Sequence, residues 1–270
     1  MEKLKAALET ARSQREGGEV PSHKPADRGN TAKKPVQDVS QAWAALTPFK
    51  PKPRVLARHL VVTAQASAAA TPFDILRTKI LLQMRENGWT RLAITSPMPR
   101  SGKSTTACNL AMGIGRQQSL HAMLFDMDLG NPSVHSFFEH RPEHPISSVL
   151  TGAVPFEDQA VRIGGNVAIS MANGPIDDPT RILLSSETEQ HLDAIEARYK
   201  PDIMIFDLPS VLVGDNTRAF LKNVDCALIV TRANATRYSQ FDTCEKEVAE
   251  HTNVLGTILN ATQDKGSLVA

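Results

Sequence analysis

The stretch from residue 96 to 105, SPMPRSGKST, has the residue types of a loop that binds a polyphosphate. It contains Gly102-Lys103-Ser104, the end of the pattern G-x-x-x-x-G-K-[ST]. In such loops the backbone N–H groups at a helix N-terminus face the phosphates, and the lysine ammonium lies between the outer phosphates. The Ser104 hydroxyl is placed to bind a Mg²⁺ ion that bridges phosphate oxygens. We therefore expect a phosphate-binding loop here.

The motif is incomplete, because Pro97 occupies the position of its first glycine. The context favours it nevertheless, since an apolar strand-like run precedes the loop and a helical pattern follows it. A plain surface turn would leave Lys103 unpaired at a helix N-terminus, which is unfavourable for a cation. The Arg100 side chain would either help to neutralise phosphate charge or simply point into solvent. The loop residues expected to contact the nucleotide are Pro99, Arg100, Ser101, Gly102, Lys103, Ser104 and Thr105.

Carboxylates follow two of the apolar runs. AMLFDMD (122–128) ends in Asp126 and Asp128, and IMIFDLP (203–209) contains Asp207. Because ligands of an open α/β sheet bind at the carboxyl ends of its strands, these side chains are expected to converge on the phosphates. A divalent cation would offset their mutual repulsion. The alternative is that each aspartate only caps the turn or helix that follows it.

Strand-like and helical patterns alternate from Leu60 onward, as is typical of a parallel sheet with crossover helices. The short apolar strands indicate burial on both faces. We predict an α/β fold with a doubly wound, mostly parallel sheet of the P-loop NTPase type. Strands are expected at 91–95, 122–125, 166–170, 203–206, 227–230 and 254–259, and helices at 72–87, 104–116, 185–199, 216–221 and 239–250.

The front of the chain is more basic than the rest. Residues 1–58 contain 12 Lys or Arg and 6 Asp or Glu, whereas residues 59–270 contain 18 and 23. Apolar residues at helical spacing predict a short amphipathic helix over 1–15, and the Gly-, Pro- and Lys-rich segment after it is typical of a flexible linker. We therefore divide the chain into an extension, 1–59, and a P-loop domain, 60–270. Trp43 and Phe49 are the linker residues able to dock on that domain.

The overall composition excludes several classes of protein. Hydrophobic residues at 41% and charged residues at 22% are normal for globular chains, and a formal net charge of +1 argues against a nucleic-acid partner. The three cysteines are far apart in the sequence and form no CxxC pair, which predicts reduced thiols. No apolar run approaches the roughly 20 residues of a membrane span. We expect a cytoplasmic protein.

These motifs together resemble the bacterial tyrosine kinase (BY-kinase) family, the capsule and exopolysaccharide branch of the P-loop ATPases that includes the septum-placing and chromosome-partitioning ATPases. The resemblance rests on Ser96-Pro97-x-Pro99 before the Gly-Lys-Ser triplet, on the two acidic strand ends, and on SSVLTG (147–152) leading to PIDDPTRILLS (175–185). It extends over about residues 72–260. Partitioning ATPases carry a second lysine early in the loop, where this chain has Met98, so the match is to the kinases.

The resemblance implies a role for each motif residue. Lys103 and Ser104 would bind ATP and Mg²⁺, and Asp126 and Asp207 would serve the metal. Asp128 would help to activate the attacking hydroxyl, so that Lys103 and Asp128 are the candidate catalytic residues.

Other residues have more than one interpretation. By resemblance to related ATPases, Asn260 at the end of the last strand would reach the adenine, with an ordinary turn residue as the alternative. Asp215 either caps the next helix or touches the nucleotide-state switch, and we favour capping. The spacing of His135, His140 and His144 fits neither a helical pair throughout nor a zinc finger, which favours a solvated loop.

The resemblance also implies a partner. The N-terminal helix is similar to the leader of stand-alone members that work with a separate membrane-bound chain-length protein. This implies a membrane-anchored polysaccharide co-polymerase as partner and an indirect association with the inner face of the membrane. A homo-oligomer is a further option.

Three features depart from the family pattern. Gly130 replaces the arginine that follows the paired aspartates, and of the Glu-x-x-Arg-x-x-Arg motif of ring assembly only Arg77 survives. The C-terminus, QDKGSLVA, lacks the tyrosine cluster of autophosphorylating members, which excludes tyrosine autophosphorylation in the tail. Of the two tyrosines in the chain, we expect Tyr199 to be packed and Tyr238 to lie near a helix start.

We expect a Mg²⁺-ATP-binding protein of polysaccharide biosynthesis that hydrolyses ATP or transfers its γ-phosphoryl group, similar to the cytoplasmic tyrosine kinases that regulate chain length and export. One alternative is a nucleotide-gated adaptor with little catalysis, which the lost tyrosines and assembly residues favour. Another is a surface-positioning ATPase that binds lipid through residues 1–15.

Overall fold

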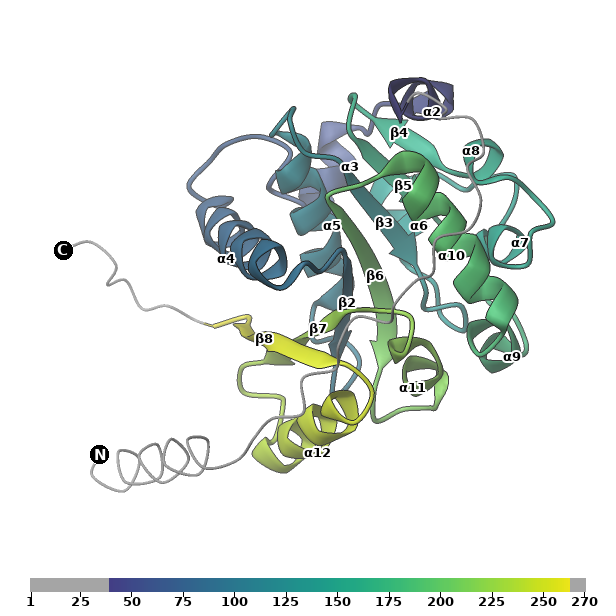
Figure 1. Ribbon diagram of the computed structural model, residues 1–270. Coiled ribbons are helices and arrows are strands. Elements are labelled where there is room, and N and C mark those ends of the chain that lie inside the picture. Colours follow the sequence, from purple (N-terminus) through teal and green to yellow (C-terminus); the bar gives the residue numbers. More distant parts are fainter. Residues whose placement is uncertain (1–38, 263–270) are drawn as a thin grey trace.

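The computed structural model describes residues 39–262, which are built around an eight-stranded β-sheet (Figure 1). The strand order is β1-β4-β5-β3-β6-β2-β7-β8, and all neighbouring pairs are parallel except β4 and β5. The predicted doubly wound, mostly parallel sheet is confirmed. The strands are β1 (Thr47–Phe49), β2 (Arg91–Ser96), β3 (Ala122–Asp126), β4 (Val161–Ile163), β5 (Val167–Ser170), β6 (Ile203–Ser210), β7 (Cys226–Arg232) and β8 (Asn253–Asn260).

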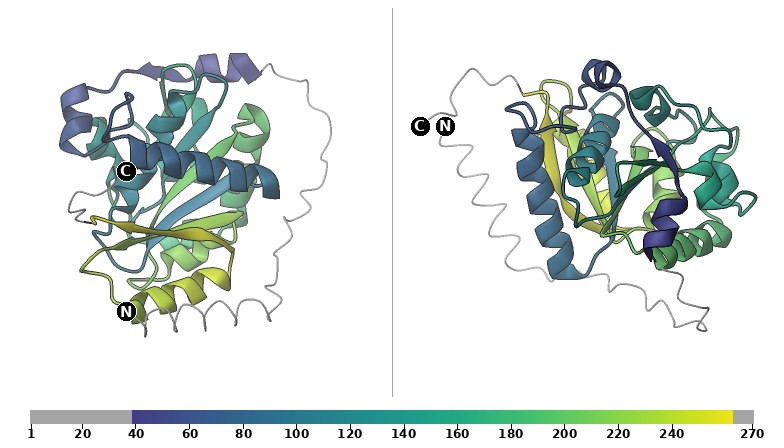
Figure 2. Two further views of the ribbon diagram at one scale, coloured as in Figure 1. Left: turned by 90° about the vertical axis from the view of Figure 1, so that its left-hand side faces the viewer. Right: turned by 90° about the horizontal axis from the view of Figure 1, so that it is seen from above.

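Helices cover both faces of this sheet (Figures 1 and 2). All five predicted helices are present, with each end within one residue of its expected position. None of the helices in residues 39–262 is both long and apolar enough to cross a membrane. The helices are α2 (Val39–Ala45), α3 (Pro53–Arg58), α4 (Thr71–Asn87), α5 (Lys103–Gly115), α6 (Val134–Phe138), α7 (Ile146–Leu150), α8 (Phe156–Gln159), α9 (Pro179–Leu183), α10 (Ser186–Tyr199), α11 (Asn216–Leu221) and α12 (Tyr238–Ala249).

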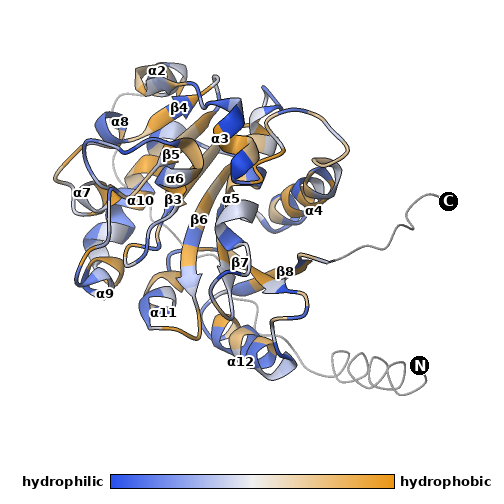
Figure 3. Cartoon of the chain, turned by 180° about the vertical axis from the view of Figure 1, so that it is seen from behind, coloured by the Kyte–Doolittle hydropathy of each residue, from blue (hydrophilic) through white to orange (hydrophobic). Residues whose placement is uncertain are grey.

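Alternate side chains of the central strands enter two separate hydrophobic cores. In β3, Met123 and Phe125 belong to the core that includes Tyr199 of α10, whereas Leu124 belongs to the core that includes Leu110 of α5. This period of two follows from strand geometry. The central strands are largely hydrophobic in Figure 3, as expected for strands that are buried on both faces.

The strand register places the acidic strand ends beside the phosphate loop. Asp126 at the end of β3 lies opposite Asp207 of β6, and β6 pairs on its other side with β2. β2 ends at Ser96, and the chain then passes through the loop into α5. Because parallel strands open at the same sheet edge, these carboxylates and the loop share one crevice.

Residues 39–59 are part of the fold, although the sequence pattern assigned them to a linker. The Trp43 side chain of α2 is 3% exposed, and its indole Nε1 donates a hydrogen bond to the Tyr199 carbonyl over 2.8 Å. β1 continues the sheet by pairing Thr47 with Val161 of β4. This segment has few apolar residues among many polar ones, so its sequence gives only a weak secondary-structure signal. The residues that bury its apolar side chains come from distant parts of the sequence. The predicted helix over 1–15 lies outside the described residues.

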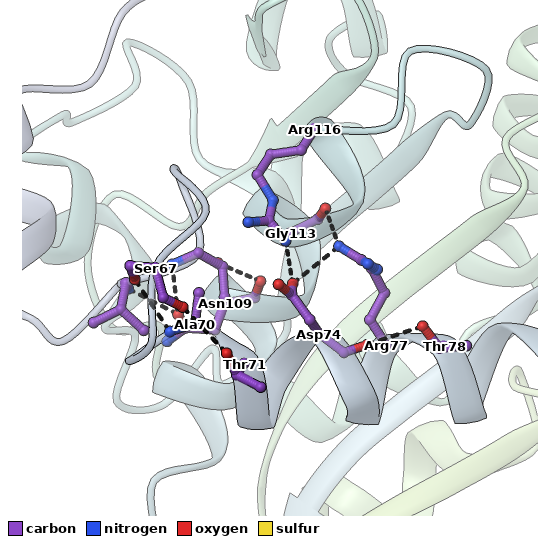
Figure 4. A network of polar contacts seen from close by, with 11 residues as sticks. Ser67, Ala70, Thr71, Asp74, Arg77, Thr78, Asn109, Gly113 and Arg116 are labelled. Atoms are coloured by element: carbon purple, nitrogen blue, oxygen red, sulfur yellow. Dashed lines mark hydrogen bonds and ion pairs between the residues drawn. The ribbon is translucent and has the colours of Figure 1, made fainter.

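A polar network joins α4 to α5 (Figure 4). Asp74 accepts hydrogen bonds from Arg77, over 3.0 Å, and from Arg116, and Arg77 also donates to the Gly113 carbonyl over 2.9 Å. The Arg77 side chain is only 11% exposed. The one arginine that survives from the ring-assembly motif is therefore engaged within its own chain.

Replacing Trp43 by alanine is expected to lower the free energy of unfolding by about 3 to 5 kcal/mol, because it opens a cavity and leaves a carbonyl without its donor. Urea denaturation measures this change. Gln41→Ala, on the exposed side of the same helix, is the control and should leave stability nearly unchanged. Equal stability of Trp43→Ala and the parent would contradict the packing of this segment.

Candidate active site

The phosphate loop joins β2 to α5 and is shaped by its own polar side chains. The hydroxyls of Ser96 and Ser101 both donate to the Met98 carbonyl, over 2.9 and 2.8 Å. Arg100 has a φ of 61° and Gly102 a φ of 94°, so the backbone turns through the left-handed region twice just before the helix. Gly102 is the N-cap of α5 and offers no side chain to the first N–H groups of the helix. An uncapped helix start of this kind is suited to bind an anion.

Two outer strands hold this loop from the side. Asn260 at the end of β8 donates from Nδ2 to the Ser101 carbonyl over 2.9 Å, and Arg232 at the end of β7 donates from Nη1 to the Arg100 carbonyl over 2.8 Å. A Cβ atom at Gly102 would lie 2.0 Å from the Asn260 amide nitrogen. The glycine is therefore required by both its dihedral angle and the close approach of Asn260.

Lys103, the first residue of α5, turns toward the acidic strand ends. Its Nζ atom lies 3.0 Å from Oδ2 of Asp128, and the two side chains are 13% and 11% exposed. Burial lowers the pKa of Lys103, but the charges of Asp207, Asp128 and Asp126 outweigh it and raise that pKa above its usual value. The ammonium is thus a fixed positive charge among three carboxylates.

Asp126 and Asp207 are buried beside each other with few partners. Oδ2 of Asp126 accepts a hydrogen bond from the Val134 N–H at the start of α6 over 3.0 Å. Among the described residues, no hydrogen bond reaches Oδ1 of Asp126 or either carboxylate oxygen of Asp207. Burial, followed by the charge of Asp207, raises the pKa of Asp126 well above its ordinary range. Burial also raises the pKa of Asp207, although the Lys103 charge opposes the rise.

This set of oxygens fits Mg²⁺. Buried carboxylates without partners are costly unless a cation offsets them, and Mg²⁺ prefers carboxylate and hydroxyl oxygens. The Ser104 hydroxyl, buried in the same crevice, contacts the Ser133 hydroxyl over 3.1 Å. Ser104, Asp126 and Asp207 are therefore the residues able to hold the ion.

Sequence reasoning did not find Ser133, Val134 or Arg232. A serine before an apolar run is a helix-start signal, and it would have located the beginning of α6. Nothing in the sequence indicates that Arg232 reaches the loop, since 132 positions separate it from Arg100.

Other candidate residues lie differently from what the sequence suggested. Asp215 occupies the N-cap position of α11, but its side chain makes no capping hydrogen bond and accepts instead from the Thr180 hydroxyl over 3.1 Å. The expected cap is wrong because the backbone of Asp215 is already helical, whereas a capping residue is extended. His135 and His140 line a surface pocket that does not include His144. The Pro99 and Arg100 side chains are exposed, at the rim of the loop.

The chain was compared with known proteins. No protein-family model matches it. Tyrosine-protein kinase YwqD of Bacillus subtilis (strain 168) is 30% identical over 203 residues, which cover 74% of this chain and 84% of that kinase. The chain belongs to the family of bacterial tyrosine-protein kinases. Tyrosine-protein kinase CpsD of Streptococcus agalactiae serotype III (strain NEM316), a further bacterial tyrosine-protein kinase, is 24% identical over 203 residues, 74% of this chain and 85% of its own.

Solved structures share the fold of this bacterial tyrosine-protein kinase. The kinase domain of the Escherichia coli tyrosine kinase ETK superposes with a TM-score of 0.69 at 21% identity, covering 89% of this chain and 98% of that domain. Cobyrinic acid a,c-diamide synthase from Mycobacterium smegmatis, solved with an ATP analog and magnesium, has a TM-score of 0.54 at 21% identity over 66% of this chain and 77% of its own. An ATP analog and magnesium are thus bound by another enzyme of the same general fold.

Asp207→Asn is expected to stabilise the protein without ligand, by roughly 1 to 3 kcal/mol at neutral pH, because it removes a buried charge that accepts no hydrogen bond from the described residues and that the nearby Lys103 ammonium offsets only in part. A raised carboxyl pKa costs stability only above the pKa of the unfolded state, so the gain should vanish below roughly pH 4. Urea denaturation in EDTA, at neutral pH and below roughly pH 4, measures this gain in stability. The exposed Asp177→Asn is the control. A loss of stability at neutral pH would contradict this description of the site.

Gly102→Ala is expected to weaken ATP binding and to destabilise the loop by about 1 to 2 kcal/mol from the left-handed backbone alone. The added methyl group would also displace Asn260. Calorimetric titration with a non-hydrolysable ATP analog measures the affinity. Gly174→Ala, where a methyl group meets open space, is the matched control, and equal affinities of the two variants would refute the argument.

Proposed function

We propose that this chain is an ATP-dependent protein-tyrosine kinase that transfers the γ-phosphoryl group in the crevice between the start of α5 and the ends of β3 and β6. The observation that carries the proposal is the contact between Lys103 and Asp128 beside two buried carboxylates, of which three oxygens accept no hydrogen bond from the described residues. Phosphoryl transfer depends mainly on positioning and on charge stabilisation, and this crevice offers groups for both.

The phosphates of ATP bind at the start of α5. The N–H groups of its first turn point out of the helix without intrahelical partners, and the helix dipole adds positive potential at the same point. Lys103 exchanges its contact with Asp128 for the outer phosphates when the nucleotide enters. Ser101, Gly102 and Thr105 supply backbone around the phosphates, while Pro99 and Arg100 line the rim.

Asn260 contributes to the nucleotide site by holding the phosphate loop and not by contacting the adenine. Its amide group is used within the chain, since Nδ2 donates to Ser101 and Oδ1 accepts from the Ala261 N–H over 2.8 Å. We retain it among the nucleotide-binding residues because it fixes the shape of the loop at Ser101 and Gly102.

Ser104, Asp126 and Asp207 are the residues that would hold Mg²⁺. A bound ion would supply charge neutralisation to the phosphates of the nucleotide. The pairing of β3 with β6 places Asp126 opposite Asp207, so the strand register itself brings the two carboxylates together.

Asp128 orients the attacking hydroxyl and accepts its proton. It lies two residues beyond Asp126 and shares the ammonium of Lys103, so it faces the outer phosphates rather than the metal. A carboxylate freed from this lysine by nucleotide binding is positioned to act as the general base.

Family membership supports a proposal for the cellular role and the partner. We propose control of exopolysaccharide or capsule chain length and export, through a membrane-anchored co-polymerase at the inner face of the membrane. One structurally similar protein is a chimera, CapA2B2, which matches 81% of this chain with a TM-score of 0.69 at 21% identity. A chimera joins segments of two proteins, which is in keeping with a second chain as partner.

Lys103→Met should lower ATP affinity by at least about tenfold, since it removes a charge-assisted phosphate contact. Asp128→Asn should retain ATP binding and lower transfer by about 10² to 10⁴. Calorimetry measures binding, and labelled ATP with Mg²⁺ and a random glutamate–tyrosine copolymer measures transfer.

Lys79→Met, on the exposed side of α4, is the matched control and should behave like the parent. Unchanged ATP binding by Lys103→Met would show that Lys103 is wrongly assigned. Tight ATP binding by the parent with neither phosphate release nor labelled copolymer would exclude the enzyme and support the nucleotide-gated adaptor.

A further inference from the structure

The chain contains two tyrosines, and only one of them is accessible. Tyr199 at the end of α10 is fully buried, with its ring in edge contact with Trp43 at 5.9 Å and Phe156 at 5.2 Å between centroids. Burial, together with the neighbouring Glu157 carboxylate, raises the pKa of its hydroxyl. A hydroxyl held in this way cannot meet a phosphoryl donor while the protein stays folded.

Tyr238 has the opposite environment. It is the first residue of α12 and is 80% exposed, the highest exposure of any large hydrophobic or aromatic side chain in residues 39–262. Its ring meets only the edge of the core, at 6.4 Å from the ring of Phe241. The hydroxyl therefore projects from the surface of a fixed helix start, where a second protein can reach it.

We propose that Tyr238 accepts a phosphoryl group from ATP bound to a second copy of this chain. This inference rests on the proposed function and names an acceptor for the same active site. The residues outside the described range contain no tyrosine, so Tyr238 is the only accessible tyrosine in the whole sequence.

The strand order indicates transfer between copies. Asp128 follows β3, whereas Tyr238 follows β7, and β6 and β2 lie between these strands. Three steps of strand spacing amount to roughly 14 Å before the position of α12 beyond the sheet is added. Figure 1 shows α12 beside β7 and β8, away from β3. The start of α12 is thus offset by three strand positions from the strand that carries the general base of its own chain.

The reaction is balanced without any further reactant. The Tyr238 oxygen forms a bond to the γ-phosphorus, and the bond from that phosphorus to the β–γ bridging oxygen breaks, releasing ADP. The hydroxyl proton passes to Asp128 of the copy that binds ATP. The product is a phosphate monoester on Tyr238.

The surroundings of Tyr238 can accommodate the new charge. A phosphotyrosine carries about −1.5 to −2 charges at neutral pH, which is favourable at a helix N-terminus. The neighbouring Arg237 adds a cation, and Lys246 lies two turns further along the same helix. The hydrogen bond and charge of Asp242, and to a smaller extent Tyr238, raise the pKa of Lys246, so its ammonium stays charged. The modification therefore does not require α12 to unfold.

The test uses two variants that complement each other. Tyr238→Phe keeps the ATP site and loses the acceptor. Lys103→Met keeps the acceptor but binds ATP at least about tenfold more weakly, so the ATP concentration is kept near the dissociation constant of the parent. Incubated together with labelled ATP and Mg²⁺, the Lys103→Met chain should become labelled, and mass spectrometry should place the phosphate on Tyr238. Lys103→Met alone should stay unlabelled, as should a Lys103→Met acceptor that also carries Tyr238→Phe. A Lys103→Met acceptor that also carries Tyr199→Phe should be labelled normally.

The copolymer assay runs in parallel and separates this inference from the proposed function. If the copolymer is labelled but the chain is not, or if the phosphate lies on Tyr199, serine or threonine, the inference is overturned while the kinase stands. Labelling of the parent on Tyr238 without labelling of the mixed variants would overturn transfer between copies. If neither the copolymer nor the chain is labelled, the proposed function and this inference are both overturned.

Discussion

Two aspartates buried side by side, with three of their four carboxylate oxygens lacking a hydrogen bond from the described residues, are the constraint on which this molecule depends. Asp126 and Asp207 face each other across neighbouring strands, and burial raises the pKa of both. Among residues 39–262, the groups that offset their charge are the Lys103 ammonium, which also contacts Asp128, and the N–H group at the start of α6. The protein therefore keeps a destabilising concentration of negative charge at one point of the sheet edge. Such an arrangement is typical of a functional site, where stability is given up for ligand binding.

The strands on the other side of β2 have a complementary role. β7 and β8 do not contribute carboxylates, but their last residues, Arg232 and Asn260, bond to the carbonyls of the phosphate loop. The loop passes through the left-handed region at Arg100 and Gly102, and these two bonds help to hold it there. The sheet thus supplies metal-binding groups from β3 and β6 and loop-holding groups from β7 and β8. α12, which carries Tyr238, begins six residues after Arg232 and is attached to the loop-holding half.

Differences from the family pattern are accommodated within the chain. Arg77 contacts Asp74 and the Gly113 carbonyl, so it braces α4 against α5, the helix that begins at the phosphate loop. The exposed tyrosine, Tyr238, lies at the start of a folded helix. An acceptor in that position has a fixed orientation, which limits the partners and geometries that can present it to an active site.

The sequence by itself determined the alternation of helices and strands, the phosphate loop and the three aspartates, because these are local patterns of apolar spacing and polar residue type. It also identified Trp43 as a residue able to dock, but not the packing of residues 39–59 or the three-residue strand β4. Only the tertiary structure decided which aspartates lack partners, that Arg232 and Asn260 hold the loop, and that Asp215 does not cap its helix. Each of these features depends on contacts between residues far apart in the chain or on a backbone dihedral angle. Long-range contacts and dihedral angles of this kind produce no periodic pattern of apolar residues in the sequence.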